Sequence, residues 1–481
     1  KAAVTDTLAA LFARRRPAPS TVFIDVPDGQ TVTYGDADRE SARLAGALGQ
    51  LGVRPGDRVA VQVEKSPAMI LLYLACVRAG AVLLPMNPAY TDDEVAYLVD
   101  DAEPTVVVQE PERAGPSGLT SLALAELAAA QPPSYDDVAR GPDDLAAILY
   151  TSGTTGKPKG AMLTQRNLAS NAAALHAVWG FGPDDVLLHA LPIFHTHGLF
   201  VATNCVLANG TGMVFLPRFD TTAVIEHLRR CTVFMGVPTF YTRLLADPSF
   251  DAGCCRSIRV FISGSAPLLA STHAEFRART GHAILERYGM TETSMITSNP
   301  LDGERRAGTV GFALPGVDVR VDGDGGIGGI EVRGPNVFAG YWRRPELTAS
   351  EFTDDGFFCT GDVGALDADA YLSIVGRSKD LIISGGLNVY PKEIEEVLDD
   401  LPGVVESAVV GLPDPDFGEA VVAVVIAEPG AALDGEALRD EVRRRLAAFK
   451  VPKRVVVAEA LPRNAMGKVE KAKLRASLVG G

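Results

Sequence analysis

The sequence predicts an α/β protein, and three observations support this fold class. The chain has 481 residues, too many for one hydrophobic core, so several packed units are expected. The apolar segments 59–63 and 81–84 flank a segment with helical character, which is the strand–helix–strand order of parallel sheets. From about residue 379 short strands and helices are mixed, which predicts a separate α+β domain.

The first strand–helix–strand unit has clear boundary residues. Ser66 is a suitable N-cap for the helix, and Gly80 is suited to end it before Pro85 closes the next strand. A weaker copy of this arrangement follows at Gly210 and the apolar run 213–216. The repetition predicts two similar, doubly wound α/β subdomains.

The pattern changes between residues 310 and 375, where short apolar segments alternate with Gly and Asp turns. This predicts a small β-barrel-like unit. We therefore expect one large domain over residues 1–378 and a small mobile α+β domain over residues 379–481. The expected strands are 317–321, 329–332, 371–375, 380–383, 406–410, 421–427 and 454–457, and the expected helices of the small domain are 393–398 and 436–448.

The composition argues against several classes of partner. The net charge is −15 and no dense run of Lys or Arg occurs, so neither a nucleic acid nor a membrane surface is an expected partner. No apolar run reaches the roughly 18 residues of a membrane span, and residues 1–16 do not resemble a signal peptide, although Lys1 in place of a methionine suggests a trimmed start. The six cysteines lack a CxxC spacing, which predicts reduced thiols, no cysteine metal site and a cytoplasmic protein.

A loop with the composition of a phosphate-binding site follows the apolar strand 145–150. Glycines let the backbone turn its N–H groups toward an anion, and hydroxyl groups and lysines in residues 151–160 add donors and positive charge. The GxxxxGK[ST] spacing of a Walker loop is absent. A flexible surface loop is the alternative, but the position directly after a buried strand favours phosphate binding. The residues assigned to this site are Thr151, Ser152, Gly153, Thr154, Thr155, Gly156 and Lys157.

This loop resembles the nucleotide loop of the adenylate-forming superfamily, which contains acyl-CoA synthetases, amino-acid adenylation domains and luciferases. Residues 194–200 and 237–243 are most similar to malonyl-CoA and methylmalonyl-CoA synthetases. The resemblance covers nearly the whole chain. It implies an enzyme that converts an acid and ATP to an acyl-adenylate and pyrophosphate, then transfers the acyl group to CoA and releases AMP. The other motifs in family order are 264–267, 286–292, 360–362, 376–377, 384–386 and 462–468.

The resemblance assigns roles to the nucleotide-binding residues. Asp362 would hold the ribose hydroxyls and Arg377 would contact ribose or phosphate, although a turn-capping aspartate and a surface ion pair are the structural alternatives. Tyr288 would stack on adenine. Glu292 and Thr151 would bind Mg²⁺, which prefers hard oxygen ligands and takes few of them from the protein. The same motifs add Gly264, Ser265, Ala266, Pro267, Glu286, Arg287, Gly289, Met290 and Thr291.

Two reaction steps imply two arrangements of the small domain. By resemblance, Lys468 enters the site in the first step and bridges the acyl carboxylate and the α-phosphate. In the second step the pantetheine arm of CoA would pass Ser384, Gly385 and Gly386, where glycines allow a close approach to the backbone. Lys379 matches the hinge position of the family, around which the small domain would rotate.

The acid is predicted from residues near its expected pocket. A purely apolar pocket cannot favour a dicarboxylic acid, because the second carboxylate would be buried without a partner. Pro238 is suited to begin a helix that carries Phe240 and Arg243 on one face. The Arg243 guanidinium would then bind the distal carboxylate, with a surface arginine as the alternative.

Four other residues complete the predicted acyl site. His197 and Ser265 could also donate to the distal carboxylate, and Met290 would limit the size of the α-substituent. His195 would gate the path of the CoA thiol. The prediction is therefore a ligase that uses ATP, Mg²⁺ and CoA to activate malonate or methylmalonate.

Several other functions stay open as alternatives. An amino-acid adenylation enzyme would normally carry an Asp near the position of His195 and adjoin a carrier domain, whereas no carrier-protein domain is expected in this chain. A luciferase would bind a large aromatic acid, which does not suit a charged pocket. A nucleotide sensor would not need both Lys468 and Glu292. A CoA ligase for another small acid would differ only in the acyl pocket.

Overall fold

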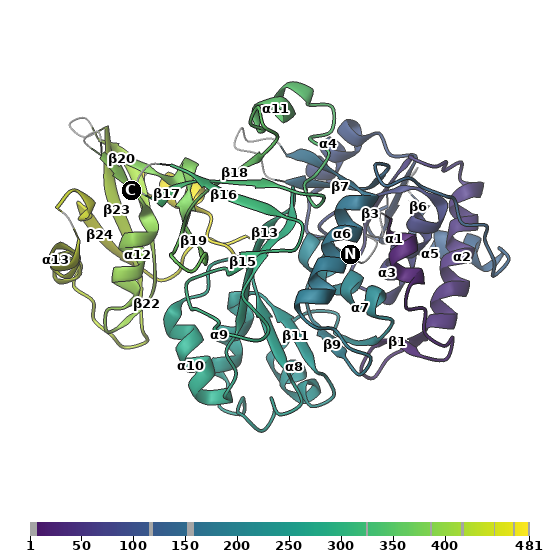
Figure 1. Cartoon of the computed structure of the whole chain (residues 1–481), viewed down its shortest axis with the longest axis horizontal. Helices are drawn as coiled ribbons and strands as arrows, with labels where there is room; N and C mark the ends of the chain where they lie inside the picture. Colours follow the sequence, from purple (N-terminus) through teal and green to yellow (C-terminus); the bar gives the residue numbers. More distant parts are fainter. Residues whose placement is uncertain are drawn as a thin grey trace.

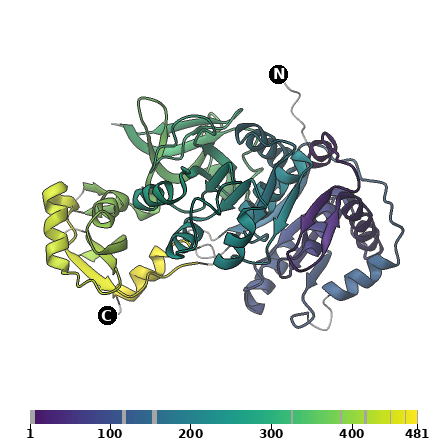
Figure 2. The ribbon, with the colours of Figure 1, turned by 90° about the horizontal axis from the view of Figure 1, so that it is seen from below.

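Two large sheets, a small antiparallel sheet and a tail make up the protein (Figure 1). The tail lies at the opposite end of the molecule from helix α2 (Tyr34–Gln50) in both ribbon views (Figure 1 and Figure 2). The computed structural model describes residues 7–114, 119–151, 158–323, 326–384, 387–414, 418–446, 448–464 and 467–479.

The first sheet has six strands in the order β6-β5-β3-β4-β7-β8. Its neighbouring strands are parallel, except that β8 is antiparallel to β7. The predicted helix boundaries are confirmed, because Ser66 caps α3 and Gly80 follows it with a left-handed φ of 67°. The elements are β3 (Arg58–Gln62), β4 (Val82–Pro85), β5 (Val106–Gln109), β6 (Leu119–Thr120), β7 (Leu145–Thr151), β8 (Lys159–Thr164), α3 (Pro67–Ala79), α4 (Asp92–Ala102) and α5 (Ser121–Ala129).

The second sheet has nine strands in the order β15-β14-β13-β12-β11-β9-β10-β1-β2, with a parallel centre and antiparallel edges. Helix α7 ends at Gly210 with a φ of 73°, as α3 ends at Gly80, and a strand follows each helix. The prediction of two α/β subdomains is confirmed. The strands are β1 (Val22–Asp25), β2 (Thr31–Thr33), β9 (Val186–His189), β10 (Gly212–Phe215), β11 (Val233–Gly236), β12 (Val260–Ser263), β13 (Leu285–Met290), β14 (Ser294–Ser298) and β15 (Phe312–Ala313).

Helices of the second subdomain connect these strands. Residues 190–196 lead from β9 into η1, a π-helix that continues directly into α7. Single turns of π-helix occur often at functional sites. The elements are α1 (Leu8–Ala13), α6 (Gln165–Val178), η1 (His197–Thr203), α7 (Asn204–Asn209), α8 (Thr221–Leu228), α9 (Pro238–Ala246) and α10 (Ala270–Thr280).

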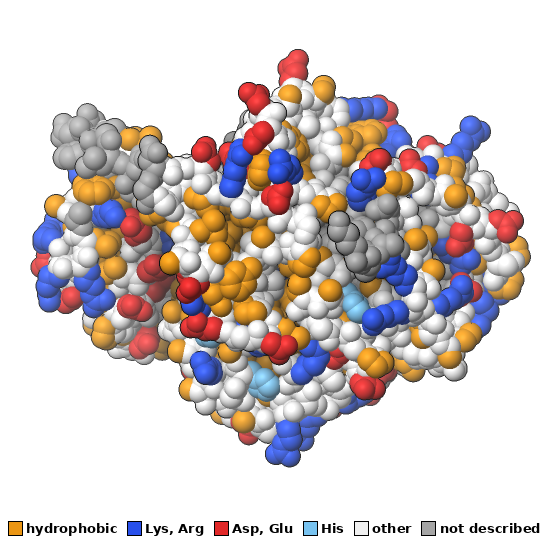
Figure 3. Space-filling model, viewed as in Figure 1, with side chains coloured by type: hydrophobic (Ala, Val, Ile, Leu, Met, Phe, Trp, Pro, Cys, Tyr) orange, Lys and Arg blue, Asp and Glu red, His pale blue; other side chains and the backbone are white. Residues whose placement is uncertain are grey.

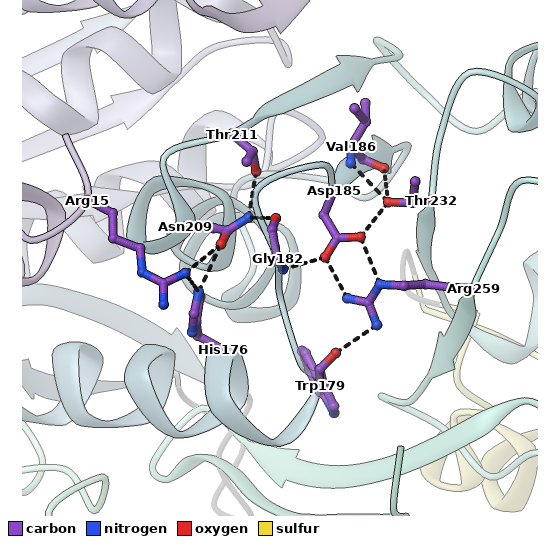
Figure 4. A network of polar contacts seen from close by, with 10 residues as sticks. All are labelled: Arg15, His176, Trp179, Gly182, Asp185, Val186, Asn209, Thr211, Thr232 and Arg259. Atoms are coloured by element: carbon purple, nitrogen blue, oxygen red, sulfur yellow. Dashed lines mark hydrogen bonds and ion pairs between the residues drawn. The ribbon is translucent and has the colours of Figure 1, made fainter. Parts of the chain in front are cut away.

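A polar network fixes the connection between α6 and β9 (Figure 4). Asp185 accepts hydrogen bonds from Arg259 Nε and Nη2, each at 2.7 Å, and from the backbone N–H of Gly182 at 2.8 Å. Asn209 donates to the Gly182 carbonyl at 2.6 Å and accepts from Arg15, which ties the N-terminal segment to the same group. Burial alone would raise the pKa of Asp185, but its hydrogen bonds, led by that with Arg259, lower it. The network therefore anchors the start of β9, whose other end leads into the candidate site.

The predicted β-rich unit is a four-stranded antiparallel sheet in the order β16-β17-β18-β19. The predicted segments correspond to β16, β17 and β19, whereas β18 was not predicted. The register between β18 and β19 places Asp362 directly opposite Arg377. The elements are β16 (Asp318–Asp322), β17 (Ile327–Arg333), α11 (Pro345–Ser350), β18 (Phe358–Leu366) and β19 (Leu372–Arg377).

The tail has its own hydrophobic clusters, around Ile394 and Val425 on one side and Val410 and Leu474 on the other. Most predicted elements are present, and two boundaries were wrong. Residues 378–380 form a short 3₁₀ helix, so the strand predicted at 380–383 starts only at residue 382. The helix predicted to residue 448 ends at 445, because Leu446 is extended with φ −123° and ψ 159°. The elements are η3 (Ser378–Asp380), β20 (Ile382–Ser384), β21 (Leu387–Val389), α12 (Pro391–Asp399), β22 (Val404–Asp414), β23 (Gly418–Ala427), α13 (Gly435–Arg445), η4 (Ala448–Lys450), β24 (Arg454–Ala458) and α14 (Lys471–Val479).

The surface carries charges of both signs. Figure 3 shows Lys and Arg side chains interspersed with Asp and Glu over the visible face. Within the described ranges, no helix combines the length and hydropathy needed to cross a membrane. All six cysteines are free thiols, and five of them are buried.

Candidate active site

Residues from both large sheets meet around Glu292. The hydroxyl group of Thr151, the last residue of β7, donates a 3.4 Å hydrogen bond to Oε1 of Glu292, which follows β13. The hydroxyl group of Tyr341 donates to the same oxygen at 3.0 Å. Burial raises the pKa of the Glu292 carboxyl, although Tyr341, Lys159 and Thr151 each lower it. The predicted pair Glu292 and Thr151 is thus brought together at the start of the predicted phosphate loop.

Residues 152–157 of that loop are not described in the structure, but Lys159, near the end of the loop, is. Nζ of Lys159 lies 4.2 Å from the centroid of the Tyr341 ring and 3.7 Å from Oε1 of Glu351. Tyr341 therefore contacts both Lys159 and Glu292, although the sequence analysis missed it. The only signal in the sequence is an aromatic pair after Gly340, without a motif around it. The predicted phosphate residues Ser152, Gly153, Thr154, Thr155, Gly156 and Lys157 lie outside the described residues.

Asp362, Tyr288 and Arg377 form one polar group. The hydroxyl group of Tyr288 donates to Oδ2 of Asp362 at 2.5 Å, and Nε of Arg377 lies 3.4 Å from Oδ1. Asp362 is buried, and its backbone N–H donates to Oγ1 of Thr360 at 3.1 Å. The residues predicted to hold ribose and adenine are therefore adjacent in space, with Tyr288 bound to Asp362 through its hydroxyl group.

Lys468 reaches this group from the tail. The backbone N–H of Lys468 donates to Oδ1 of Asn464 at 3.0 Å, and the backbone N–H of Gly467 donates to the carbonyl of Asn464 at 2.9 Å. A Cβ atom on Gly467 would lie 2.9 Å from Cγ2 of Thr239, so Gly467 packs against the start of α9. Burial, followed by the nearby Arg377, lowers the pKa of Lys468 to about 8, while Asp362 raises it. Lys468 is thus close enough to Asp362 and Arg377 for their charges to act on it.

Two histidines after β9 form the next part of the site. Nδ1 of the buried His197 lies 3.3 Å from Oγ of Ser265, a residue with a left-handed φ of 74°. The backbone N–H of His197 also donates to Nδ1 of His195 at 3.4 Å. Burial, together with Arg287 and Lys468, lowers the pKa of His195 to about 4, so this imidazole is neutral at neutral pH.

Arg287 brings a buried positive charge to these histidines. Its residue is 3% exposed, and its Nε and Nη2 have no hydrogen-bond partner in the part of the chain that the structure describes. A Cβ atom on Gly264 would lie 2.5 Å from the guanidinium carbon, so Arg287 packs directly against Gly264. Burial lowers the pKa of Arg287 to about 9, while Tyr241 raises it. Because an unpaired buried cation is costly, this arrangement fits an anionic ligand.

Arg243 does not share this burial. Helix α9 begins at Pro238 as predicted, and Phe240 is buried, with its ring 4.0 Å from that of Phe219. Arg243 is exposed. Arg243 therefore lies outside the buried side of the helix, which Phe240, Tyr241 and the following leucines form. Its assignment to the distal carboxylate stays a prediction.

The other predicted nucleotide residues lie on two adjacent segments. Residues 264–267 follow β12 and residues 286–290 belong to β13, and these strands are parallel neighbours. Burial raises the pKa of Glu286 to about 8, although Lys392 of the tail lowers it. Gly264, Glu286 and Arg287 are buried, Ser265, Ala266, Tyr288, Gly289, Met290 and Thr291 are half-buried, and Pro267 is exposed.

The predicted CoA residues and hinge lie where the tail joins the small sheet. Ser384 is buried at the end of β20, whereas Gly385 and Gly386 lie outside the described residues. Lys379 is exposed in η3, the short helix between β19 and β20. Nζ of Lys392 donates to the carbonyl of Ile374 at 2.6 Å, which joins α12 to β19. The tail is therefore docked on the small sheet in this structure.

Comparison with known proteins covers both parts of the chain. The family described as AMP-binding enzyme matches residues 10–342, and the AMP-binding enzyme C-terminal domain matches residues 393–468. A feruloyl-CoA synthase from an Amycolatopsis species is 38% identical over 93% of this chain and 94% of the relative. A malonate–CoA ligase from Arabidopsis thaliana is 35% identical over 94% of this chain and 85% of the relative.

A solved structure is also similar over nearly the whole length. The crystal structure of ATP-bound MatB from Rhodopseudomonas palustris has 51% sequence identity, covers 98% of each chain and gives a TM-score of 0.94. The apo form of the same protein gives a TM-score of 0.84 at the same identity and coverage. The arrangement of the chain described above is thus closer to the ATP-bound form.

Proposed function

Because this chain belongs to the AMP-binding enzyme family and is an AMP-forming acid–thiol ligase, we propose that its acid is malonate or methylmalonate. One observation carries this choice. The buried Arg287 guanidinium has two unpartnered donors among the described residues, packs against Gly264 and acts electrostatically on His197, which contacts Ser265. A distal carboxylate would pair with this cation and satisfy donors that an uncharged acid would leave unpaired. The likeness to a malonate–CoA ligase supports the same choice.

The geometry supports a two-step reaction. In the first step a carboxylate oxygen of the acid attacks the α-phosphorus of ATP, the bond to the β-phosphate oxygen breaks, and pyrophosphate leaves. Lys468, beside Asp362 and Arg377, supplies positive charge where negative charge develops. In the second step the CoA sulfur attacks the acyl carbon, the bond to the AMP oxygen breaks, and the thiol proton is lost. His195 stays neutral and so adds no further positive charge near Lys468.

Mg²⁺ fits the residues around Glu292. A buried carboxylate and the Thr151 hydroxyl group are hard oxygen donors, and burial raises the pKa of the Glu292 carboxyl, which a bound cation would offset. When bound, Mg²⁺ neutralises charge on the leaving pyrophosphate. Glu292 and Thr151 would hold it, while Tyr341 orients the carboxylate.

The two steps would use two positions of the tail. We place the domain boundary between residues 378 and 379, with Lys379 as the hinge, because η3 separates the small sheet from the first strand of the tail. The present position brings Lys468 to Asp362 and suits the first step. Rotation of the tail would remove Lys468 and bring Ser384 to the path of CoA. The bond from Lys392 to the Ile374 carbonyl would then break.

A panel of acids tests the proposed substrate. The purified enzyme is assayed for thioester formation with malonate, methylmalonate, propionate and ferulate, at saturating ATP and CoA. We expect kcat/KM for malonate to exceed that for propionate by at least about 30-fold. This factor corresponds to about 2 kcal/mol, the lower end of the cost of leaving a buried charge without its partner. Ferulate as the best substrate would contradict the proposal and favour an aromatic acid, as in the feruloyl-CoA synthase relative.

The pKa of Lys468 predicts how the first step depends on pH. Burial lowers this pKa to about 8, so the lysine loses its proton and its charge as the pH rises through that value. Pyrophosphate release measured without CoA should therefore fall about tenfold per pH unit above the pKa. In Lys468→Arg the alkaline decrease should disappear from any remaining activity, because a guanidinium stays protonated. A wild-type rate that does not change far above pH 8 would contradict this role of the charge.

A further inference from the structure

A lysine of the first subdomain reaches into the second, next to the acyl site. Lys65 lies between β3 and α3, and its Nζ is 2.9 Å from the carbonyl oxygen of His189 and 3.0 Å from Nδ1 of the same residue. Nζ also lies 4.3 Å from the centroid of the Phe215 ring. His189 ends β9, so Lys65 joins the two large sheets at the start of the segment that carries His195 and His197.

The contacts of His189 fix its tautomer. A carbonyl oxygen only accepts, so Nε2 of His189, which lies 2.9 Å from the carbonyl oxygen of Gly198, carries the ring hydrogen and donates it. Nδ1 of the neutral ring is then the acceptor for the hydrogen bond from Nζ of Lys65, although burial lowers the pKa of this lysine well below its ordinary value. The hydroxyl group of Thr203 donates to the same carbonyl at 3.0 Å. His189 is 1% exposed, and burial, followed by the charge of Lys65, lowers its pKa well below the ordinary value.

Gly198 belongs to the π-helix η1 and follows His197 directly. A Cβ atom at this position would lie 2.0 Å from the carbonyl oxygen of Pro192, so the backbone is closely packed and a side chain is excluded. The turn of residues 195–198 is therefore contacted at Gly198 by both His189 and Pro192. The same turn presents Nδ1 of His197 to Ser265.

We propose that Lys65 and His189 are positioning residues that hold the turn of residues 195–198 in place for binding of the acid. The inference rests on the proposed function, because it assigns the acyl pocket to His197, Ser265 and Arg287. Lys65 acts through His189 and the Gly198 carbonyl. Misplacement of a binding group by about 1 Å costs up to about 100-fold in rate. Because His197 lies in this turn and is assigned to the acyl pocket, loss of the support should affect the acid more than the nucleotide.

Lys65→Met tests the proposal, because methionine has a similar length and removes both the charge and the hydrogen bonds. We expect kcat/KM for the acid to fall about 10- to 100-fold, with KM for ATP and the melting temperature much less affected. The acid used is the one that the wild-type enzyme converts fastest. Failure of wild type to use malonate would therefore overturn the proposed function without deciding this inference.

Tyr73→Phe is the matched control. The hydroxyl group of Tyr73, on α3, donates to Oδ1 of Asn204, on α7, at 2.9 Å. This buried bond also joins the two subdomains, but it ends on α7 and not at Gly198. We expect Tyr73→Phe to lower stability without a selective loss for the acid. Equal losses in both variants, or no loss in Lys65→Met, would overturn the proposal and leave Lys65 as a structural link.

A second pair of variants covers the case in which Lys65→Met does not fold. His189→Gln keeps an N–H group near the position of Nε2, whereas His189→Leu removes it. We expect the glutamine variant to retain more kcat/KM for the acid than the leucine variant, at similar KM for ATP. Equal acid kinetics in the two His189 variants would overturn the role of the bond to Gly198.

Discussion

Replacement of Lys468 by alanine should slow formation of the acyl-adenylate about 100- to 1000-fold, the usual cost of losing one electrostatic donor to a transition state. The charges of Asp362 and Arg377, where the nucleotide is proposed to bind, act on this lysine. Only the first step needs its charge. Thioester formation from supplied malonyl-adenylate should therefore remain largely intact in the variant. The measurement is pyrophosphate release for the first step and loss of free thiol for the second.

Lys473→Ala is a suitable control for this experiment. Lys473 lies only a few residues beyond Lys468, but its side chain is exposed and pairs with Glu470 on the surface. Surface pairs of this kind contribute roughly 0–1 kcal/mol. Both half-reactions should be unchanged in the control. Equal loss of both half-reactions in Lys468→Ala would contradict the proposal that the tail adopts two arrangements.

Replacement of Arg287 by methionine should lower kcat/KM for malonate by about 30- to several-thousand-fold. Removing one partner of a buried charge pair costs about 2–5 kcal/mol, which corresponds to this range. Propionate lacks the distal carboxylate, so its kcat/KM should decrease far less. The measurement is the steady-state rate of thioester formation with each acid at saturating ATP and CoA.

The stability of the Arg287 variant separates binding from folding. Without its ligand, Arg287 is a buried cation with two unpartnered donors among the described residues. Replacing such a group by an apolar side chain of similar size is often neutral or stabilising. We therefore expect the melting temperature of Arg287→Met to be maintained or raised while malonate activity is lost. Arg243→Met, at an exposed position, should have the smaller effect on malonate.

Parts of the fold could be predicted because local sequence signals, such as helix caps, mark the ends of its elements. Ser66 and Gly80 are recognised from capping alone, and the structure has them as expected. Helix α14 was not predicted, since its Lys- and Arg-rich sequence has only Leu474 buried and does not differ from a solvated tail. The short helix at residues 378–380 was also missed, because nothing in the local sequence distinguishes it from the start of a strand.

The candidate site could be predicted only where the residues that contact one another belong to the same sequence motif. The pairing of Asp362 with Arg377 comes from the register of two strands, and the two residues belong to separate motifs. Burial of Arg287 and exposure of Arg243 depend on what packs against each element, here Gly264 and Phe219. A single sequence does not show such neighbours. The link from Lys65 to His189 joins residues 124 positions apart and leaves no local signal.

Competition between two acids tests the central claim most directly, because it measures the ratio of their kcat/KM values in one tube. Equal amounts of malonate and propionate are supplied with ATP and CoA, and the two thioesters are quantified by mass spectrometry. We predict that malonyl-CoA predominates with wild type and that Arg287→Met removes most of this preference. An unchanged product ratio in Arg287→Met would contradict the claim that this buried cation selects a dicarboxylic acid.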